Sequence, residues 1–468
     1  MVRPGGLTVV LDVGKSLSKL SLWTADGRLL ERRSRPNVRV KGPPFDSLDV
    51  EGIEAWFTAG LREFARLGSV AAIVPVAHGA AAAIVRDGQL HGRPMDYEAS
   101  TPPERRASYE SSRDPFAATG SPLLPAGLNL GAQLDALEAL DPGVLADGAT
   151  LLTWPQYWAW RLTGVAAAEV TSLGCHTDLW CPSRAAPSML AVRRGWAARL
   201  PPLRPAAAVL GTLTPEWAAR TGLGTDVRVH CGIHDSNAAL LGIRGYAELA
   251  GRDLTVLSTG TWFVAMRAAA TPVDLAALPE SRDCLVNIDA AGRPIPSARF
   301  MGGREIERLA GADAPGLDAE TDQPALLAAL PAVLARGARI VPTFAPGTGP
   351  FPRGVGRETA IGTDATERRA TIALYAALVA DVALELIGAR ECLVVEGRFA
   401  RAQLLVRALA SLRPAMTVYV APADSDVSYG ALRLVDPSLA PMTALRPVAP
   451  LAIDLRDYRR AWREEAGA

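Results

Sequence analysis

The alternation of apolar and polar residues near the start of the chain predicts short strands joined by tight turns, with one helix among them. Residues 7–13 form an apolar run and residues 19–23 alternate, which is typical of strands. Asp26-Gly27 is a strong hairpin signal, so a third strand is expected after it. Helical spacing covers residues 47–67, and residues 70–77 return to a strand. This order is not the alternating strand–helix order of a dinucleotide-binding fold, and no GxGxxG motif follows a predicted strand.

A similar pattern returns in the second half of the chain. Residues 253–258 and 262–266 are typical of two strands, joined by the small-residue turn Thr259-Gly260-Thr261. Two strand–turn–strand units of this kind favour two halves of related design. We therefore expect an N-terminal domain over residues 1–246 and a C-terminal domain over residues 247–468.

Long helical patterns and one further strand fill the C-terminal half. Helices are predicted over residues 366–387 and 401–412, and the strand over residues 392–395 leads into the turn Glu396-Gly397. Strands and helices in this mixture place the chain in the α/β class.

Composition excludes several classes of protein. A chain of 468 residues predicts two large domains or three small ones. Hydrophobic residues make up 49% and charged residues 21%, which supports a sizeable core and excludes a disordered chain. The 49 Lys and Arg balance the 49 Asp and Glu, so there is no net basic field for a nucleic acid.

Cysteine usage and the N-terminal run indicate a reduced compartment. The five cysteines have no CxxC spacing, which fits neither a disulfide framework nor a four-cysteine zinc site, so buried thiols are expected. The apolar run Leu7–Leu11 is too short for a signal peptide or a membrane span. We expect a cytoplasmic protein with no membrane partner.

The first turn carries the first candidate chemistry. Asp12 ends a buried strand, and a turn of small residues follows it. Phosphate oxygens prefer the exposed N–H groups of such a turn, and a metal that bridges phosphates prefers the carboxylate, usually through water. The residues that supply both are Asp12, Gly14, Lys15, Ser16, Ser18 and Lys19. It is not a Walker A loop, because Val9 stands where that motif has its first glycine, and an Asp-x-Gly triplet alone is more often a plain turn.

Lysine is scarce, and its placement is uneven. The chain has only Lys15, Lys19 and Lys41, so arginine supplies the other 46 of the 49 basic residues. Coding bias toward Ala, Gly, Pro and Arg explains the scarcity. It does not explain why two of the three lysines flank the turn after Asp12.

Further small-residue turns in the second half could hold a nucleotide. Ser258, Thr259, Gly260 and Thr261 lie between two strands, and Gly302-Gly303 precedes a short helical pattern. Gly397, Arg398 and Phe399 follow a strand, where ribose or adenine could lie against exposed backbone. Each is also typical of an ordinary turn.

The segment Gly232-Ile233-His234-Asp235 is the richest in chemistry. Asp235 stands where a strand gives way to a helix, and a carboxylate in that position can accept a proton from an alcohol that attacks a phosphoryl group. The alternative is a plain N-cap. His78-Gly79 and Asp96 follow or lie near a strand end and could bond a polyhydroxylated ligand, although a histidine in such a place is more often structural.

The ordered set of these pieces resembles the FGGY carbohydrate kinases. The resemblance rests on the Asp-x-Gly hairpin, on Gly-Ile-His-Asp, on Ser-Thr-Gly-Thr-Trp and on Val-Val-Glu-Gly-x-Phe-Ala, in that order along the chain. Matching segments also include Ala77–Ala80, Leu151–Tyr157, Leu162–Gly164 and Glu169–Ser172.

The resemblance implies two actin-like (ribonuclease H-like) domains that flank a central cleft, with ATP mainly on the C-terminal domain and the sugar mainly on the N-terminal one. By position, Asp235 corresponds to the general base and Asp12 to the residue that positions Mg²⁺, with Asp235 also near the metal through water. The turn from Gly14 to Lys19 corresponds to the γ-phosphate hairpin. The second phosphate loop and the adenosine pocket correspond to Ser258–Thr261, Gly302-Gly303 and Gly397–Phe399. Sugar contacts correspond to His78, Gly79, Asp96, Gln156 and His234.

Three positions depart from the family pattern. Lys15 stands where threonine is common, so it either adds a charge near the phosphates or points away from them. Arg398 replaces a second glycine and Ala402 replaces a common asparagine, which leaves the details of adenine binding open.

The substrate is the least constrained part of the prediction. The His-Asp pair at the base resembles the rhamnulose and fuculose kinases, which suggests phosphoryl transfer to a ketose, above all a 6-deoxy-ketohexulose. Xylulose, ribulose and polyols stay open. A non-catalytic actin-like ATPase and a sugar-binding regulator are the alternatives from other classes. The family resemblance is compatible with a homodimer.

Overall fold

The computed structural model describes residues 6–100, 102–271, 274–311, 317–422 and 426–467. The chain forms two compact units. The first consists of Met1–Gly245, Val286–Pro294 and Asp424–Met442, and the second of Tyr246–Leu285, Ile295–Ala423 and Thr443–Ala468. In the part of the chain that the structure describes, every helix is too short or too polar to span a membrane.

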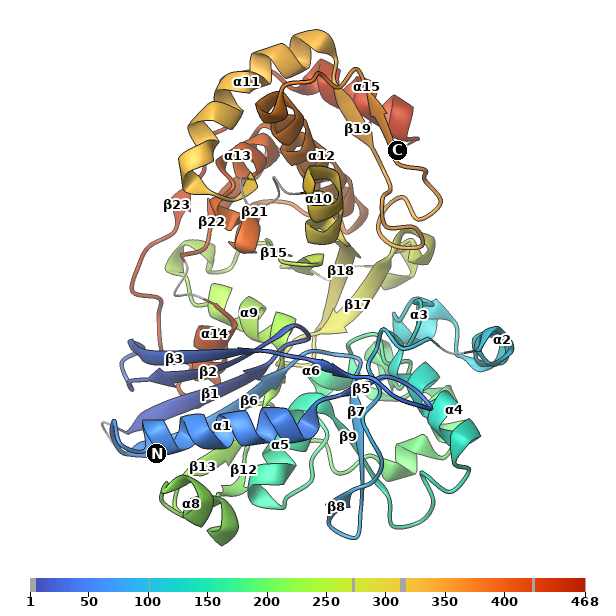
Figure 1. Ribbon diagram of the computed structural model, residues 1–468, viewed down its shortest axis with the longest axis vertical. Helices are drawn as coiled ribbons and strands as arrows, with labels where there is room; N and C mark the ends of the chain where they lie inside the picture. The colour runs from blue at the N-terminus through green and yellow to red at the C-terminus, as the bar shows by residue number, and fades with distance from the viewer. Residues whose placement is uncertain (1–5, 101, 272–273, 312–316, 423–425, 468) are drawn as a thin grey trace. The chain divides into compact units, whose positions relative to one another are not determined.

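A mixed sheet forms the centre of the first unit (Figure 1). Its strands are β1 (Leu7–Val13), β2 (Leu17–Trp23), β3 (Leu29–Pro36), β6 (Val70–Ala77), β12 (Val209–Thr212) and β13 (Arg228–His230), with β14 (Ile233–His234) beside β6. The order is β12-β13-β6-β1-β2-β3. The hairpins β1–β2 and β2–β3 are antiparallel, whereas β6 is parallel to β1 and β13 to β6. The predicted hairpin at the chain start is confirmed.

Smaller elements complete the first unit. Its helices are α1 (Val50–Phe64), α2 (Pro103–Ser112), α3 (Phe116–Thr119), α4 (Leu130–Leu140), α5 (Trp154–Thr163), α6 (Val170–Leu173), α7 (Met189–Arg193), α8 (Pro215–Thr221), α9 (Asp235–Ile243) and α14 (Val427–Val435). Its short strands are β4 (Arg39–Val40), β5 (Ser47–Leu48), β7 (Ala82–Arg86), β8 (Gln89–Leu90), β9 (Thr150–Thr153), β10 (Trp180–Cys181) and β11 (Ala186–Pro187). Helix α1 begins after Asp49, which accepts the Gly52 N–H at 3.0 Å.

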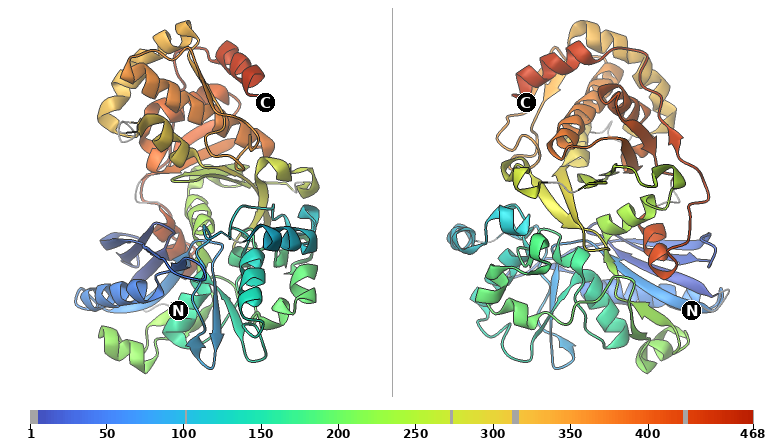
Figure 2. Two further views of the ribbon diagram at one scale, coloured as in Figure 1. Left: turned by 45° about the vertical axis from the view of Figure 1, so that its right-hand side comes forward. Right: turned by 180° about the vertical axis from the view of Figure 1, so that it is seen from behind.

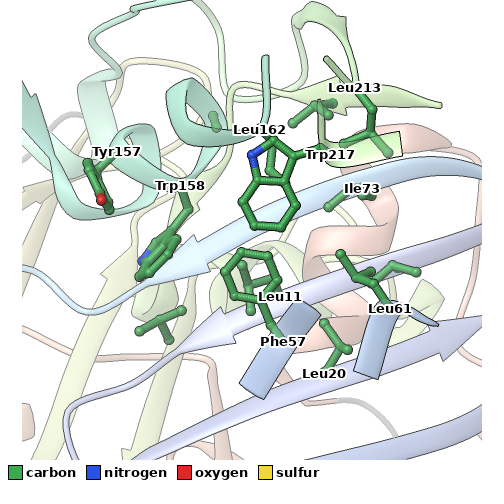
Figure 3. Packing of buried hydrophobic residues seen from close by; sticks show 14 of the residues in the cluster. Leu11, Leu20, Phe57, Leu61, Ile73, Tyr157, Trp158, Leu162, Leu213 and Trp217 are labelled. Atoms are coloured by element: carbon green, nitrogen blue, oxygen red, sulfur yellow. The ribbon is translucent and has the colours of Figure 1, made fainter. Parts of the chain in front are cut away.

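Strand β1 is buried on both faces, and alternate residues serve different cores. Val9 and Leu11 point into a cluster with α1, α5 and α8, where Phe57 stacks on Trp217 at a centroid distance of 5.1 Å (Figure 3). Such an aromatic pair contributes about 1 kcal/mol beyond its buried area. Val10 points the other way, into a cluster with α9 and α14. Figures 1 and 2 show α1 and α14 on opposite sides of the sheet.

The second unit repeats the strand order of the first. Its sheet contains β15 (Leu254–Thr259), β16 (Phe263–Ala268), β17 (Cys284–Ile288), β18 (Pro294–Phe300), β21 (Cys392–Gly397), β22 (Thr417–Val420) and β23 (Arg446–Pro447). The run β18-β16-β15-β21-β22-β23 matches β3-β2-β1-β6-β13-β12 in order and in strand direction. Two halves of related design, as expected from the sequence, are therefore present in the topology, and both halves are mixed α/β units.

Helices cover the sheet of the second unit, with a small two-stranded sheet beside them. They are α10 (Gly302–Ala310), α11 (Gln323–Arg336), α12 (Ala365–Leu386), α13 (Gln403–Leu412) and α15 (Arg456–Ala466), and the small sheet pairs β19 (Arg339–Val341) with β20 (Arg357–Thr359). Helix α12 contacts α10, α11 and α13, and its middle is buried throughout. The long helices and the strand predicted in this half are confirmed as α12, α13 and β21.

A buried ion cluster fastens the C-terminal helix of this unit. Asp381 on α12 is fully buried, and three arginines surround its carboxylate. Arg413 Nε donates to Oδ1 at 2.6 Å and Arg459 Nε to Oδ2 at 2.8 Å. Arg463 on α15 adds a bond to Oδ2 at 3.0 Å. Both carboxylate oxygens are thus satisfied, and α15 is held to α12.

Candidate active site

Asp12 lies at the end of β1 on the face that α9 and α14 cover. It follows Val10 at the two-residue spacing of a strand, so both side chains point to the same side of the sheet. The carboxylate is buried, and the ammonium of Lys19, its cross-strand neighbour on β2, stands 3.7 Å away. Lys19 is 30% exposed and reaches the carboxylate from the solvent side.

Two glycines bring α9 and α14 together beside Asp12. A Cβ on Gly430 would stand 1.7 Å from the Ala238 carbonyl oxygen, and a Cβ on Gly242 would stand 3.2 Å from Gly430 Cα. Only glycine allows the helices this approach. Both helices begin with a carboxylate, because Asp235 is the first residue of α9 and Asp426 caps α14.

Asp426 is a site residue that the sequence reasoning missed. Its Oδ1 accepts the Ser428 N–H at 2.9 Å, and its Oδ2 pairs with Arg32 on β3 at 2.9 Å. The only sequence signal is an aspartate three residues before a Tyr-Gly-Ala run, which is typical of any N-cap.

The electrostatics of Asp12 combine burial with two like charges. Burial raises the pKa of Asp12 to about 7; Lys19 opposes the rise, while the carboxylates of Asp235 and Asp426 add to it. Within the described ranges, no three His, Cys, Asp or Glu side chains are close enough to bind a metal ion by themselves. Mg²⁺ beside phosphates is usually held by one or two carboxylates together with the phosphate oxygens and water. The negative charge of Asp12 is only partly neutralised by Lys19, and Asp235 is close enough to act on it, so the two carboxylates fit that set of magnesium ligands.

The turn after Asp12 is closed by its own backbone. Gly14 N–H donates to the Leu17 carbonyl at 3.1 Å, and the Asn37 amide donates to the Gly14 carbonyl at 2.7 Å. Ser18 is fully buried, and its hydroxyl donates to Asn37 at 2.8 Å, so it shapes the turn and does not face a ligand. Ser16 is exposed at the tip.

Lys15 points away from the turn. Its ammonium pairs with Asp96 and lies 4.5 Å from the centroid of the Tyr97 ring. Asp96 is buried, and Arg39 Nε also reaches it at 3.3 Å. Lys15, predicted to contact phosphate, and Asp96, predicted to contact the sugar, therefore form a salt bridge with each other.

His78 adjoins this group. Its ring meets the Tyr97 ring edge-on at 5.6 Å between centroids. Nδ1 stands 2.6 Å from the Gly79 carbonyl and must donate to it. Burial lowers the pKa of His78, while the Gly79 carbonyl, Asp235 and Asp96 act in the opposite direction.

His234 stands directly beside Asp235. The Asn237 amide nitrogen donates to His234 Nδ1 at 3.2 Å, which leaves the proton on Nε2. Nε2 lies 3.2 Å from Asp235 Oδ1 and 3.2 Å from Cys175 Sγ. Burial lowers the pKa of His234, with the charge of Asp235 acting in the opposite direction, so a neutral ring stands beside the Asp235 carboxylate. A Cβ on Gly79 would stand 2.6 Å from Cys175 Sγ, so this side of the site has no room for a larger residue.

A buried acid supports the segment before Asp235. The Thr171 hydroxyl donates to the Glu169 carboxylate at 2.6 Å. The oxygen of the same hydroxyl accepts the backbone N–H of His234 at 3.1 Å. Burial raises the pKa of Glu169 to about 7 against the lowering effect of these bonds. The sequence signal was the Glu169–Ser172 segment itself, whose role as a support for His234 appears only in three dimensions.

Gln156, predicted as a sugar contact, is hydrogen-bonded within the protein. It is fully buried on α5, and its amide donates to the carbonyls of Cys231 at 3.2 Å and Gly232 at 3.3 Å. Its oxygen accepts the Thr153 hydroxyl at 2.5 Å. With both ends of the amide engaged, Gln156 holds the turn between β13 and β14 that leads to Asp235.

In the second unit, two predicted turns meet. Gly303 in the first turn of α10 packs against the turn between β15 and β16, and a Cβ there would stand 2.0 Å from the Gly260 carbonyl oxygen. The Arg304 N–H donates to the Thr261 carbonyl at 3.4 Å. Ser258 is partly exposed and Thr261 is exposed, and a Cβ on Gly302 would stand 2.7 Å from the Phe263 ring.

The third predicted turn, at Gly397–Phe399, packs against the end of β15. Gly397 has a φ of +86°, and a Cβ on it would stand 2.4 Å from the Thr259 carbonyl oxygen. The Thr259 hydroxyl donates to the Glu396 carbonyl at 2.6 Å and accepts the Phe399 N–H at 3.0 Å. Phe399 itself is buried 5.4 Å from the Phe263 ring, so its side chain belongs to the core.

Arg398 is engaged within its own unit. It bonds Glu307 at 2.8 Å and Asp318 at 3.2 Å, and its guanidinium lies over the Phe399 ring. Ala402 is buried just before α13. All five cysteines are buried thiols, as expected from their spacing.

Comparison with known proteins adds independent findings. Residues 251–442 match the family described as carbohydrate kinase FGGY, C-terminal domain. Over 99% of both chains, the protein is similar to the crystal structure of a carbohydrate kinase from Novosphingobium aromaticivorans, with 54% identity and a TM-score of 0.93.

More distant structures share the fold alone. A xylulose kinase from Rhodospirillum rubrum is 18% identical, with 98% of each chain covered and a TM-score of 0.80. A glycerol kinase from Plasmodium falciparum, solved with ADP, is 12% identical over 99% of this chain and 98% of its own, with a TM-score of 0.80.

Proposed function

The chain belongs to the FGGY family of carbohydrate kinases and is a sugar phosphotransferase, and from this premise we propose that it transfers the γ-phosphate of ATP to a ketose hydroxyl, with Asp235 as the general base. The observation that carries the assignment is the position of Asp235 at the first turn of α9. There the helix dipole favours negative charge, the Ser236 N–H donates to Asp235 Oδ1 at 2.6 Å, and His234 Nε2 lies 3.2 Å from the same oxygen.

The remaining roles follow from the charges around Asp12. We assign Asp12 to Mg²⁺ through water, with Asp235 nearby, and the Gly14 turn and Lys19 to the γ-phosphate. The ion, when bound, neutralises phosphate charge. In the second unit, the turns at Ser258–Thr261, Gly302-Gly303 and Gly397 pack against one another, and we assign the rest of ATP to their exposed residues Thr261 and Gly397. This assignment gives the sugar and the γ-phosphate mainly to residues 1–246 and the rest of ATP mainly to residues 247–468.

For the sugar we propose a ketose, with a 6-deoxy-ketohexulose such as rhamnulose or fuculose first. The support is the His234-Asp235 pair, together with a polar group around His78 and Asp96 in the same unit. Pentuloses are the second candidate and polyols the third, since relatives of this fold include a xylulose kinase and a glycerol kinase.

The deciding experiment is an ADP-release assay over ketoses, polyols and aldonates. We expect one ketose to stimulate ADP release strongly. Asp235→Ala should lower kcat with that sugar by about 10³-fold, the middle of the range for a lost general base, while ATP still binds. Asp457→Ala, at a side chain that is 88% exposed on α15, is the matched control and should leave turnover unchanged.

Other outcomes would favour the other classes. ATP turnover that ignores every sugar would indicate an actin-like ATPase, and sugar binding without ADP release would indicate a regulator. Near-normal turnover of Asp235→Ala would overturn the assignment of the base.

A further inference from the structure

Lys15 is placed by a salt bridge that its sequence position does not suggest. It follows Gly14 in the hairpin assigned to phosphate, yet its ammonium pairs with Asp96 on a loop 81 residues later. The Lys15 side chain is 19% exposed and that of Asp96 is 2% exposed. A paired, mostly buried ammonium has one orientation, and here that orientation leads away from the Gly14 turn.

Lys15 shares a neighbour with His78. The Lys15 Nζ lies 4.5 Å from the Tyr97 ring centroid, and the His78 ring stands 5.6 Å from the same ring at an interplanar angle of 83°. Asp235 also acts electrostatically on His78, so this group adjoins the proposed base. The Tyr97 ring, an apolar surface of the kind that packs on sugar C–H groups, connects the two polar side chains.

The hydrogen-bonding roles of the two side chains are complementary. His78 Nδ1 donates to the Gly79 carbonyl, so in the neutral ring Nε2 is an acceptor. Burial, which lowers the pKa of His78, favours that neutral form. Lys15 has three N–H donors, of which Asp96 takes one. A hydroxyl can donate to His78 and accept from Lys15, so the pair suits a sugar with neighbouring hydroxyls.

The charges of this group sum to a net negative charge. Lys15 and Arg39 carry two positive charges against the three carboxylates of Asp46, Asp96 and Glu98, all of which pair with Arg39. No positive charge is left over for a substrate carboxylate, and Asp235 adds negative charge nearby. An aldonate would therefore bind with an uncompensated charge.

We propose that Lys15 is a specificity residue of the sugar site, which donates to a hydroxyl of an uncharged ketose while His78 accepts from its neighbour, with Asp96 as the positioning residue. This inference rests on the proposed sugar kinase activity. It reassigns Lys15 from the phosphates to the substrate, and it selects uncharged sugars against sugar acids.

The test compares the three lysines under one chemical change. Lys15→Met should raise KM for the best ketose about 10- to 100-fold, the range for a lost charged hydrogen bond, with KM for ATP within about twofold of the wild type. Lys19→Met should do the reverse and raise KM for ATP. Lys41→Met, at an exposed position, controls for the substitution itself.

Binding without turnover gives an independent readout. Calorimetry of the sugar with the ATP-free protein should show weaker binding to Lys15→Met and to Asp96→Asn, with an unchanged affinity for ATP. A circular dichroism melt identifies any variant that fails to fold, and Asp96→Asn then supplies the comparison, because it frees Lys15 while keeping the volume.

The outcomes separate this inference from the proposed function. If no sugar stimulates wild-type ADP release, the proposed function fails regardless of Lys15. If the wild type is active but Lys15→Met changes KM for ATP and not for the sugar, Lys15 is a phosphate residue and the inference is overturned. Preference of the wild type for gluconate over ketoses would also overturn it.

Discussion

Two buried aspartates, one in each unit, have opposite surroundings. Asp381 has three arginines on one carboxylate, and both of its oxygens accept two or more bonds. Asp12 has one lysine at 3.7 Å and two further carboxylates close enough to raise its pKa. The arginines more than neutralise the negative charge of Asp381, whereas Lys19 does not neutralise the combined negative charge at Asp12.

The difference separates a structural role from a binding role. Arginine presents a rigid fork that matches a carboxylate, and around Asp381 it closes a network that fastens α15. Lysine is a compact point charge, and at Asp12 a single one leaves negative charge uncompensated, as a site for a divalent cation requires. Both lysines of the first turn pair with acidic groups of the site, and two arginines, Arg32 and Arg39, also do so.

The largest expected effect is on the binding aspartate. Asp12→Asn should lower kcat by about 10³- to 10⁴-fold, which is about 4–5.5 kcal/mol of transition-state stabilisation. The unfolding temperature should not fall, because the change removes a buried charge that two carboxylates oppose. Steady-state kinetics and calorimetry measure the two effects. A large loss of stability with retained kcat would make Asp12 a structural residue like Asp381.

The structural aspartate should respond in the opposite way. Asp381→Ala leaves three arginines without their common partner, so we expect a loss of about 3–5 kcal/mol in the free energy of unfolding. Urea denaturation followed by tryptophan fluorescence measures it, since Trp462 on α15 is fully buried. The fraction that remains folded should keep wild-type KM values. An unchanged urea midpoint would show that the cluster contributes no net stability.

A smaller effect is expected for the single cation at Asp12. Lys19→Ala should lower kcat/KM for ATP about 10-fold, or about 1.4 kcal/mol, because one partly exposed ammonium is lost near the phosphates. Lys19→Arg should recover most of it, since a guanidinium also reaches a carboxylate and a phosphate. Turnover at several ATP concentrations gives the values. Equal kcat/KM in all three proteins would remove Lys19 from the site.

The smallest effect is expected at the cap of α14. Asp426→Asn keeps a side chain that caps helices well but removes one negative charge near Asp12. The apparent Mg²⁺ affinity, measured by titrating turnover, should fall about threefold, with no change in melting temperature. Asp436→Asn, at the other end of the same helix, is the control. A fall in melting temperature without a change in Mg²⁺ response would limit Asp426 to capping.

Much of the fold was predictable because its signals are local. The hairpin around Gly14, the strand before Asp235 and the helix α12 are each recorded in a short stretch of alternating or helical spacing. The repeated strand order needed only the two strand–turn–strand units to be recognised. The start of α1 was harder to predict, since the helix begins at Val50, after its N-cap Asp49, inside the span 47–67 that the sequence pattern predicts as helix.

What the sequence could not supply are contacts between distant segments. The direction of Lys15 depends on a carboxylate 81 residues away, and the burial of Gln156 depends on the backbone of Cys231 and Gly232. Asp426 enters the first unit only because Gly430 fits against Ala238, nearly two hundred residues earlier. None of these pairings leaves a periodic or compositional trace.

The late position of α14 in the chain has a consequence for synthesis on the ribosome. The helix consists of residues 427–435, yet it covers Val10, Val74 and Val76 on a sheet made from the start of the chain. Until almost the whole polypeptide has been made, that apolar face is covered by α9 alone, and Asp12 has no second helix beside it. A chain terminated early therefore exposes an apolar surface that chaperones and proteases can recognise. It also lacks a complete site, so it could not hydrolyse ATP without phosphorylating a sugar.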